Sequence, residues 1–448
     1  MGDEMNFPQM TDVEFDTPDA TVTTFDELLV NRLVSSTSRQ PQRQIKVLLY
    51  SHDTFGLGHL RRNLAIADRL LAYKHRFSVR LLTGSPVIGQ WRLPRGLSVQ
   101  PLPPVVKEGA ERYAARDPKA LFALIKGYRE ALILKAVLRF QPDVFLVDHS
   151  PAGMNGELLS TLALIRHELP HTRVILGLRD ITDSPQTVRA LWREQEIPAL
   201  LEHAYDELFV YGSKALFDVV EGYGLTGSIA RRVRYCGHVV AADDASCRID
   251  EPSGQQVCWS PTRAQGRPVV LVSAGGGGDG FPLMNAYLRA LARIGDGAVY
   301  SVMVTGPLMP DTEKAALREA AHDRSDVELI DHTTDLMPSL RAADLAVAMA
   351  GYNTSVEIIA ARKRAILVPR TAPRAEQLMR AALLAKLGVV HSILPGPNLA
   401  DELASLVPRL ITAPPPPAAA WAALDLNGAE CVAAHLTEMI PALLECAA

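Results

Sequence analysis

A histidine stands at the start of a predicted helix, directly after a glycine-containing turn. The apolar run 45–50 predicts a strand, and segment 51–59 leads from it into that helix. Gly56 and Gly58 let the backbone turn tightly and approach a ligand closely, and the free N–H groups of a helix start attract anions. His59 is therefore placed for general base catalysis beside a phosphate-bearing or hydroxylated substrate. The alternative is a plain turn in which His59 caps the helix.

A second glycine-rich turn follows the apolar run 268–274 and precedes a helical pattern that starts at Phe281. Its first four residues are Gly275, Gly276, Gly277 and Gly278. The run satisfies the G-x-G-x-x-G pattern of dinucleotide-binding proteins, in which an acidic residue follows the next strand. Here the strand expected at 299–304 ends in Thr-Gly-Pro instead. We therefore expect this turn to hold a phosphate with its backbone N–H groups, and a ribose to be bound elsewhere.

The ribose contact is predicted where a strand at 345–348 ends and a helix begins near Thr354. Gly351 opens the turn, Asn353 or Thr354 can cap the helix, and Glu357 lies close to its first turn. A carboxylate can accept hydrogen bonds from both hydroxyls of a ribose. The simpler interpretation is that Glu357 only complements the helix dipole.

A further strand, 365–369, leads into another helix start with charged and amide side chains. These are Arg370, Arg374, Glu376 and Gln377. The two cations can stabilise a diphosphate, and the carboxylate and amide can bind sugar hydroxyls. A solvated helix start is the alternative interpretation.

The order of these segments resembles the GT-B glycosyltransferases, most closely the branch of the lipid-linked N-acetylglucosaminyltransferase of peptidoglycan synthesis. The resemblance extends over about 45–445 in organisation and is specific at 350–357 with 376–377, and at 58–59. It implies a nucleoside-diphosphate sugar as donor, with a UDP-sugar favoured. In that family pattern Glu357 holds the ribose, the turn 351–354 the diphosphate, and 376–377 the donor sugar, while His59 is the base.

The turn before His59 departs from that branch, which carries more glycines there. Segment 56–65 resembles instead a related GT-B branch that hydrolyses nucleotide-linked sugars. The main alternative to a transferase is therefore a nucleotide-sugar hydrolase, in which water replaces the acceptor. A non-catalytic nucleotide-sugar-binding subunit is the alternative from a different class.

Two aspartates follow predicted strands of the first half, at the sheet edge where ligands bind. Asp148 follows the strand 144–147, and Asp180 follows the strand 174–178. Either carboxylate can act as a catalytic residue that orients His59, can hold an acceptor hydroxyl or amine, or can form a turn. The two do not form a D-x-D pair, so we expect a metal-independent enzyme with no cofactor besides its donor. The acceptor, a small molecule or a lipid-linked one, stays open.

Strands and helices alternate with short connections, which predicts an α/β fold with two doubly wound, Rossmann-like domains facing a cleft. We expect a disordered leader at 1–43, an acceptor domain at 44–240, a linker or loop at 241–266 and a nucleotide-sugar domain at 267–412. The Pro-rich break and last helix fall at 413–448. By the family resemblance, that helix crosses back onto the first domain.

The length of 448 residues exceeds the usual limit of a single core. A net charge of −4 gives no argument for nucleic-acid binding. Five cysteines without a C-x-x-C motif, and no apolar run close to about 18 residues, predict a cytoplasmic protein with reduced thiols. The basic amphipathic segment 118–140 can make a peripheral membrane contact, although such a stripe more often faces a core.

Overall fold

The computed structural model describes residues 43–53, 58–73, 76–90, 93–107, 113–115, 121–240, 261–331, 333 and 335–439. The described residues from Gln44 onward belong to one compact unit. Of the leader expected at 1–43, only Arg43 is described, and of the linker expected at 241–266, only 261–266. Structural statements below concern the described residues.

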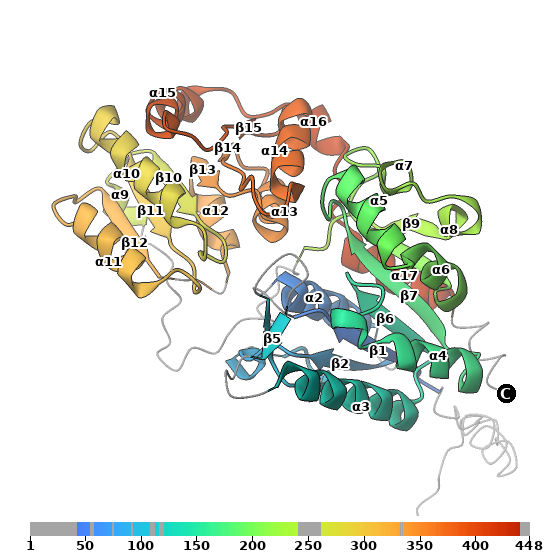
Figure 1. Cartoon of the computed structure of the whole chain (residues 1–448). Helices are drawn as coiled ribbons and strands as arrows, with labels where there is room; N and C mark the ends of the chain where they lie inside the picture. Colours follow the sequence, from blue (N-terminus) through green and yellow to red (C-terminus); the bar gives the residue numbers. More distant parts are fainter. Residues whose placement is uncertain are drawn as a thin grey trace, which may run out of the picture. The chain divides into compact units, whose positions relative to one another are not determined.

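Seven parallel strands form the first sheet, in the order β3-β2-β1-β6-β7-β8-β9 (Figure 1). They are Ile45–Ser51 (β1), Phe77–Thr83 (β2), Ser98–Pro101 (β3), Val144–Asp148 (β6), Arg173–Arg179 (β7), Glu207–Tyr211 (β8) and Val233–Tyr235 (β9). Strand β1 pairs with β2 on one side and with β6 on the other, so that Val47 lies between Val79 and Val144. The winding of the chain therefore reverses between β1 and β6, the position where open α/β sheets bind ligands.

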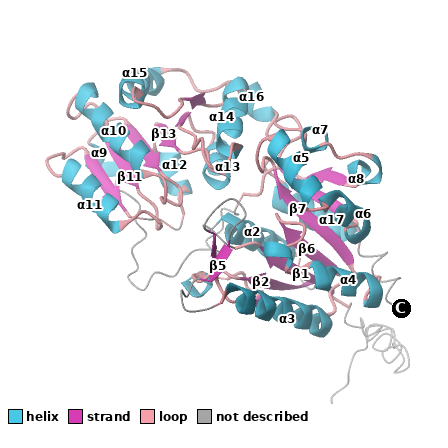
Figure 2. Cartoon of the chain, in the orientation of Figure 1, coloured by secondary structure: helices cyan, strands magenta, loops and turns pink. Residues whose placement is uncertain are grey.

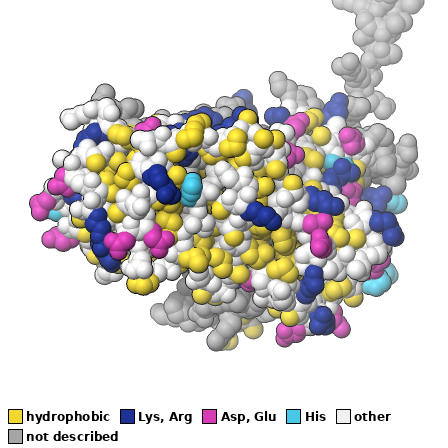
Figure 3. Space-filling view, turned by 90° about the horizontal axis from the view of Figure 1, so that it is seen from above, with side chains coloured by type: hydrophobic (Ala, Val, Ile, Leu, Met, Phe, Trp, Pro, Cys, Tyr) yellow, Lys and Arg dark blue, Asp and Glu magenta, His cyan; other side chains and the backbone are white. Residues whose placement is uncertain are grey.

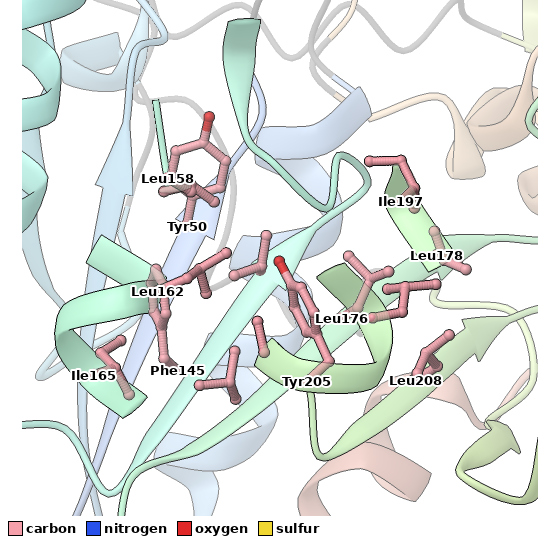
Figure 4. Close-up of a cluster of buried hydrophobic side chains, with 14 of the residues drawn as sticks. Tyr50, Phe145, Leu158, Leu162, Ile165, Leu176, Leu178, Ile197, Tyr205 and Leu208 are labelled. Atoms are coloured by element: carbon pink, nitrogen blue, oxygen red, sulfur yellow. The ribbon is translucent and has the colours of Figure 1, made fainter. Parts of the chain in front are cut away.

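Helices connect these strands and cover both faces of the sheet (Figure 2). They are α2 (Gly58–Ala72), α3 (Phe122–Phe140), α4 (Leu159–Glu168), α5 (Pro185–Glu194), α6 (Ile197–Ala204), α7 (Val219–Tyr223) and α8 (Gly227–Arg231), with short 3-10 turns at Ile88–Gln90 and Met154–Gly156. The strands are apolar on both sides because both faces are covered. Figure 4 shows one of the two resulting cores, in which Phe145 and Leu176 of the sheet pack with Leu162 of α4 and Tyr205.

Six parallel strands form the second sheet, in the order β12-β11-β10-β13-β14-β15. They are Val269–Ser273 (β10), Tyr300–Val304 (β11), Val327–Ile330 (β12), Leu345–Ala348 (β13), Ala365–Leu367 (β14) and His391–Ser392 (β15). The helices are α9 (Pro261–Ala264), α10 (Phe281–Ile294), α11 (Asp311–Ala320), α12 (Met337–Ala342), α13 (Tyr352–Ala360), α14 (Glu376–Lys386), α15 (Leu399–Thr412) and α16 (Ala418–Ala422). Here the winding reverses between β10 and β13.

The last described helix, α17 (Gly428–Glu438), returns to the first sheet and packs on α2. Val432, Ala433 and Leu436 are fully buried in the apolar cluster that contains Ile45 and Val47. The α/β class, the two Rossmann-like units and the crossing C-terminal helix are therefore confirmed. The sequence did not predict β12, β15 or the antiparallel pair β4 (Val105–Lys107) and β5 (Tyr113–Ala115).

No described helix is long and apolar enough to cross a membrane. In α3, Ile133 and Val137 face the core, whereas Leu124 and Tyr128 are exposed. Arg129, a basic residue of that segment, is buried against Glu157 instead of facing water. One face of the molecule shows charged side chains of both signs with hydrophobic ones between them, as the small net charge leads one to expect (Figure 3).

Truncation of one α17 side chain tests whether this helix belongs to the apolar cluster that contains Ile45 and Val47. We expect Leu436→Ala, at a fully buried position, to lower the free energy of unfolding by about 2–5 kcal/mol, because it leaves a cavity. The exposed Leu394 supplies the control, and Leu394→Ala should change the free energy of unfolding by less than about 0.5 kcal/mol. Urea denaturation followed by fluorescence measures both. Equal midpoints for the two variants would show that α17 is not part of the core.

Candidate functional site

The base predicted at His59 lies beside a carboxylate from the neighbouring strand. Helix α2 starts at Gly58, just after β1, and Asp148 ends β6 across the winding reversal. The Nδ1 atom of His59 lies 2.6 Å from Oδ2 of Asp148. Because a carboxylate can only accept, Nδ1 carries the proton and donates it to Asp148. The lone pair of the neutral ring is then on Nε2, which is the atom that can take a proton from a substrate.

Arg62 holds the other side of the Asp148 carboxylate. It donates to Oδ1 through both Nε and Nη2, and both side chains are almost completely buried. Its Nη2 also lies 3.0 Å from Nδ1 of His59; since that nitrogen already bears a proton, this is a close approach of two donors. Arg62 is three residues after His59 on α2, which puts both side chains on one helix face.

Burial sets the charge of this pair. Desolvation lowers the pKa of His59 to about 4, and the nearby cations Arg62 and Arg179 add to that effect against the opposing carboxylate of Asp148. Although burial alone raises the pKa of Asp148, the charges of Arg62 and His59 hold it below its usual value. At neutral pH the site therefore contains a neutral imidazole on an ionised carboxylate.

Two further histidines surround His59. The ring centroids of His59 and His149 are 5.1 Å apart, and those of His59 and His52 are 5.7 Å apart. His149 has a φ of 68°, a left-handed conformation that costs free energy in a non-glycine residue and is enriched at functional sites. No group of three His, Cys, Asp or Glu side chains within the described residues is arranged to hold a metal ion.

The predicted ribose residue, Glu357, lies on α13 and contacts α2. Its Oε1 atom accepts from Nη2 of Arg61 at 2.6 Å. Desolvation raises the pKa of Glu357, and the charge of Arg61 opposes that shift. The start of α13 lies against the start of α2, because a Cβ on Gly58 would stand 3.1 Å from Nδ2 of Asn353. Two helix N-termini, each at a winding reversal, therefore adjoin.

Helix α13 begins two residues earlier than predicted. The helix starts at Tyr352 and its N-cap is Gly351, without a side-chain hydrogen bond. The expectation that Asn353 or Thr354 caps this helix is therefore wrong, because both residues lie inside the first turn. This position turns Thr354 toward the glycine-rich turn, where its Oγ1 lies 3.4 Å from a Cβ built on Gly275.

The glycine-rich turn links β10 to α10 and exposes Gly275, Gly276 and Gly278. The N–H groups of Gly275 and Gly277 are used inside the turn, by Ser273 Oγ and Ala274 O. Among the described residues the N–H groups of Gly276 and Gly278 make no hydrogen bond. These two donors are what the turn offers to a phosphate. Gly56, the remaining predicted glycine, lies outside the described residues.

Arg370 organises the residues before α14. Its Nη2 donates to Oε1 of Glu376 at 2.7 Å, its Nη1 to Asp279 of the glycine-rich turn at 3.1 Å, and its N–H to Oε1 of Gln377 at 3.1 Å. The buried Oε2 atom of Glu376 has no hydrogen-bond partner among the described residues. That oxygen is a free acceptor for a ligand hydroxyl.

Asp180 does not lie beside His59, as a residue orienting the base would. It forms a buried, two-pronged ion pair with Arg380 of α14, at 2.8 and 3.2 Å. Arg380 also donates to the carbonyl of Ala350 just before α13. The structure therefore gives Asp180 a role in joining the two sheets. Arg374 lies on the loop that precedes α14.

Sequence reasoning missed Arg61, Arg62 and Arg380. The i, i+3 spacing of His59 and Arg62 was a usable signal. The partners of Arg61 and Arg380 are 296 and 200 residues away, so no local pattern pointed to them.

Comparisons with known proteins agree with this geometry. Residues 270–425 match the model of the glycosyltransferase family 28 C-terminal domain. The chain is similar to the glycosyltransferase of kitacinnamycin (16% identity, 88% of this chain and 99% of that one, TM-score 0.58). It is also similar to MurG of Acinetobacter baumannii (13% identity, 89% of this chain and 100% of that one, TM-score 0.55). A third similar structure is a UDP-glucosyltransferase from Polygonum tinctorium (13% identity, 88% of this chain and 98% of that one, TM-score 0.58). No curated protein matches the chain.

At such identities the solved structures show the fold, and the family model adds the class of the second half. Together they show a GT-B fold over most of the chain and a glycosyltransferase family 28 domain at 270–425, as the resemblance predicted. The protein is a glycosyltransferase, and the family 28 match agrees with the predicted branch.

Two glycines of the glycine-rich turn differ in whether the fold tolerates a side chain at their position. Gly277 has a φ of 89°, and a Cβ there would lie 2.3 Å from the carbonyl oxygen of Thr305, whereas a Cβ on Gly276 meets no atom closer than 3.6 Å. We expect Gly277→Ala to lower the free energy of unfolding by more than about 1 kcal/mol, and Gly276→Ala to leave it within about 0.5 kcal/mol. Thermal unfolding measures this difference, and equal melting temperatures would refute it.

Proposed function

We propose that this glycosyltransferase moves a sugar from a nucleoside-diphosphate sugar, with a UDP-sugar favoured, to a hydroxyl or amine of an acceptor, without a metal ion or other cofactor. The observation that carries the proposal is the meeting of two helix starts. One start carries the His59–Asp148 pair, and the other carries Glu357 beside a glycine-rich turn. A base and an anion site are thereby brought to one place.

On the donor side, Glu357 binds the ribose hydroxyls, and Arg61 leaves that carboxylate as the ribose arrives. The N–H groups of Gly276 and Gly278 and the start of α13 hold the diphosphate. Arg370 contributes positive charge, while Glu376 and Gln377 face the donor sugar. The preference for uridine draws on the family resemblance and on the UDP-glucosyltransferase among the similar structures.

On the acceptor side, Nε2 of His59 takes the proton of the attacking group. The acceptor atom bonds to the anomeric carbon while the bond from that carbon to the phosphate oxygen breaks, and the nucleoside diphosphate leaves with the electron pair. The imidazolium that forms stays on the ionised Asp148 carboxylate, which favours its charge. The charge that develops on the diphosphate is stabilised by donors already in place, which is the efficient form of electrostatic catalysis.

The donor assignment predicts opposite effects for the two members of one ion pair. Glu357→Gln should weaken UDP binding by roughly 1.5–3 kcal/mol, the range for a charge-assisted hydrogen bond. Arg61→Met removes the group that competes with ribose, so it should leave UDP affinity equal or higher. Calorimetric titration with UDP measures both. If the two variants lose affinity equally, the ion pair has only a structural role and Glu357 does not hold the ribose.

The base assignment predicts a loss of rate without a loss of donor affinity. His59→Asn should reduce turnover on the order of 10²- to 10⁴-fold and leave UDP affinity unchanged. The exposed His167 (84% exposed side chain) supplies the control, and His167→Asn should be fully active. The assay follows UDP release from UDP-glucose and UDP-N-acetylglucosamine with a panel of alcohols and amines. Undiminished turnover in His59→Asn would show that His59 is a cap, and equal release without any acceptor would favour the hydrolase.

The same residue sets the pH dependence. Because burial lowers the pKa of His59 to about 4, the acidic limb of kcat/KM should lie near pH 4 and not in the usual imidazole range. An unfolded histidine has a pKa of about 6.5, so the unfolded state binds the proton first. Stability from this group is therefore lost as the pH falls from about 6.5 to about 4, and His59→Asn should abolish that part of the loss in thermal unfolding.

A further inference from the structure

One cation at the carboxyl end of the first sheet pairs with no carboxylate of the described residues. Arg179 ends β7, and its strand neighbour across the sheet is Tyr211 of β8. The N–H of His149 donates to the carbonyl of Gly177 at 2.7 Å, two residues before Arg179 on the same strand face. Ile175, four residues before Arg179 on the same strand face, is buried in the apolar cluster that contains Leu60 and Leu64 of α2. The Arg179 side chain therefore starts on the sheet face that α2 covers.

Two neighbouring guanidinium groups have an aspartate partner, whereas this one has none in the described part of the chain. Arg62 is paired with Asp148, and Arg380 with Asp180. Within the described residues the Nε of Arg179 is buried without a hydrogen-bond partner, and no carboxylate forms an ion pair with its guanidinium. Desolvation and the charges of Arg62 and Arg380 lower the pKa of Arg179 to about 10, against a smaller opposing effect of Glu376. A charge held in this way raises the free energy of the folded state.

His149 follows β6, the strand next to β7, and lies beside the base. Its ring centroid is 5.1 Å from that of His59, and its buried Nδ1 has no hydrogen-bond partner in the part of the chain that the structure describes. Burial, together with the charge of Arg179, lowers the pKa of His149 well below its usual value. The ring is therefore neutral at pH 7. Two buried nitrogens without a hydrogen-bond partner among the described residues, one of His149 and one of Arg179, therefore follow or end neighbouring strands near the proton acceptor.

We propose that Arg179 binds an anionic group of the acceptor, a carboxylate or a phosphate, next to the hydroxyl or amine that His59 deprotonates. The proposal rests on the proposed function and adds the chemical class of the acceptor. The donor diphosphate has its own donors on the second sheet, at the glycine-rich turn and the start of α13, whereas Arg179 belongs to the first sheet with His59. A bound anion would neutralise the guanidinium of Arg179, which no carboxylate of the described residues does.

The stability of a variant distinguishes this role from a structural one. Because Arg179 lacks a partner among the described residues and lies among other cations, Arg179→Met should keep or raise the melting temperature. Arg173 begins the same strand at its opposite end and pairs with Asp206, which makes Arg173→Met a matched control. A melting temperature that falls by several degrees in Arg179→Met, but not in the control, would overturn the proposal.

Binding of inorganic phosphate tests the site itself, at constant ionic strength and with UDP at saturation. We expect ³¹P NMR titration to show at least a tenfold weaker phosphate affinity in Arg179→Met, partial retention in Arg179→Lys, and wild-type affinity in Arg173→Met. UDP affinity should stay within twofold in all three variants. Unchanged phosphate affinity in Arg179→Met would overturn the proposal, and a large loss of UDP affinity would assign Arg179 to the donor diphosphate instead.

Failure of this proposal and failure of the proposed function give different results. If the wild-type protein binds UDP and His59→Asn is inactive, but Arg179→Met binds phosphate as tightly as the wild type, only the assignment of the acceptor class fails. If the wild type does not bind UDP, the donor assignment fails.

Discussion

The carboxylate of Asp148 is the interaction on which the arrangement of the site depends. It is a buried anion with Arg62 on one oxygen and His59 on the other. Removing it would leave a guanidinium uncompensated in the interior, which costs more than the loss of a surface pair. Arg62 also lies over the rings of Tyr211 and Tyr352, at 5.3 and 5.5 Å.

Tyr352 carries this arrangement into the second half of the chain. Its hydroxyl donates to the carbonyl of Tyr211 at 2.9 Å, and the guanidinium of Arg380 lies 5.6 Å from its ring. Arg380 in turn holds Asp180 and the carbonyl of Ala350. The base and the start of α13 are therefore connected through continuous contacts among buried groups, each cation neutralised by an aspartate at a strand end. Such fully paired networks define one geometry, because a half-paired buried charge is strongly disfavoured.

Sequence reasoning succeeded where the signal is local. Alternating strands and helices predicted both sheets, and the positions of Glu357 and His59 at helix starts followed from turn glycines and capping rules. It failed for β12 and β15, which are short and mostly half-exposed, so they lack the continuous apolar run of a central strand. It also placed Asp180 with His59, because two carboxylates at neighbouring strand ends look equivalent in a sequence. Only the fold shows that Arg380, from the other half, takes one of them.

The return of α17 to the first sheet has a consequence for how the protein is made. The apolar cluster between the first sheet and α2 contains Val432 and Leu436 of α17, and also Tyr352 and Val356 of α13. Domains generally fold in order as the ribosome delivers them, but here residues 44–240 emerge long before the side chains that complete one of their two apolar faces. Part of the apolar surface of the nascent first half therefore stays exposed to water until some two hundred more residues have been translated. This protein is expected to depend on chaperones that shield apolar surface during its synthesis.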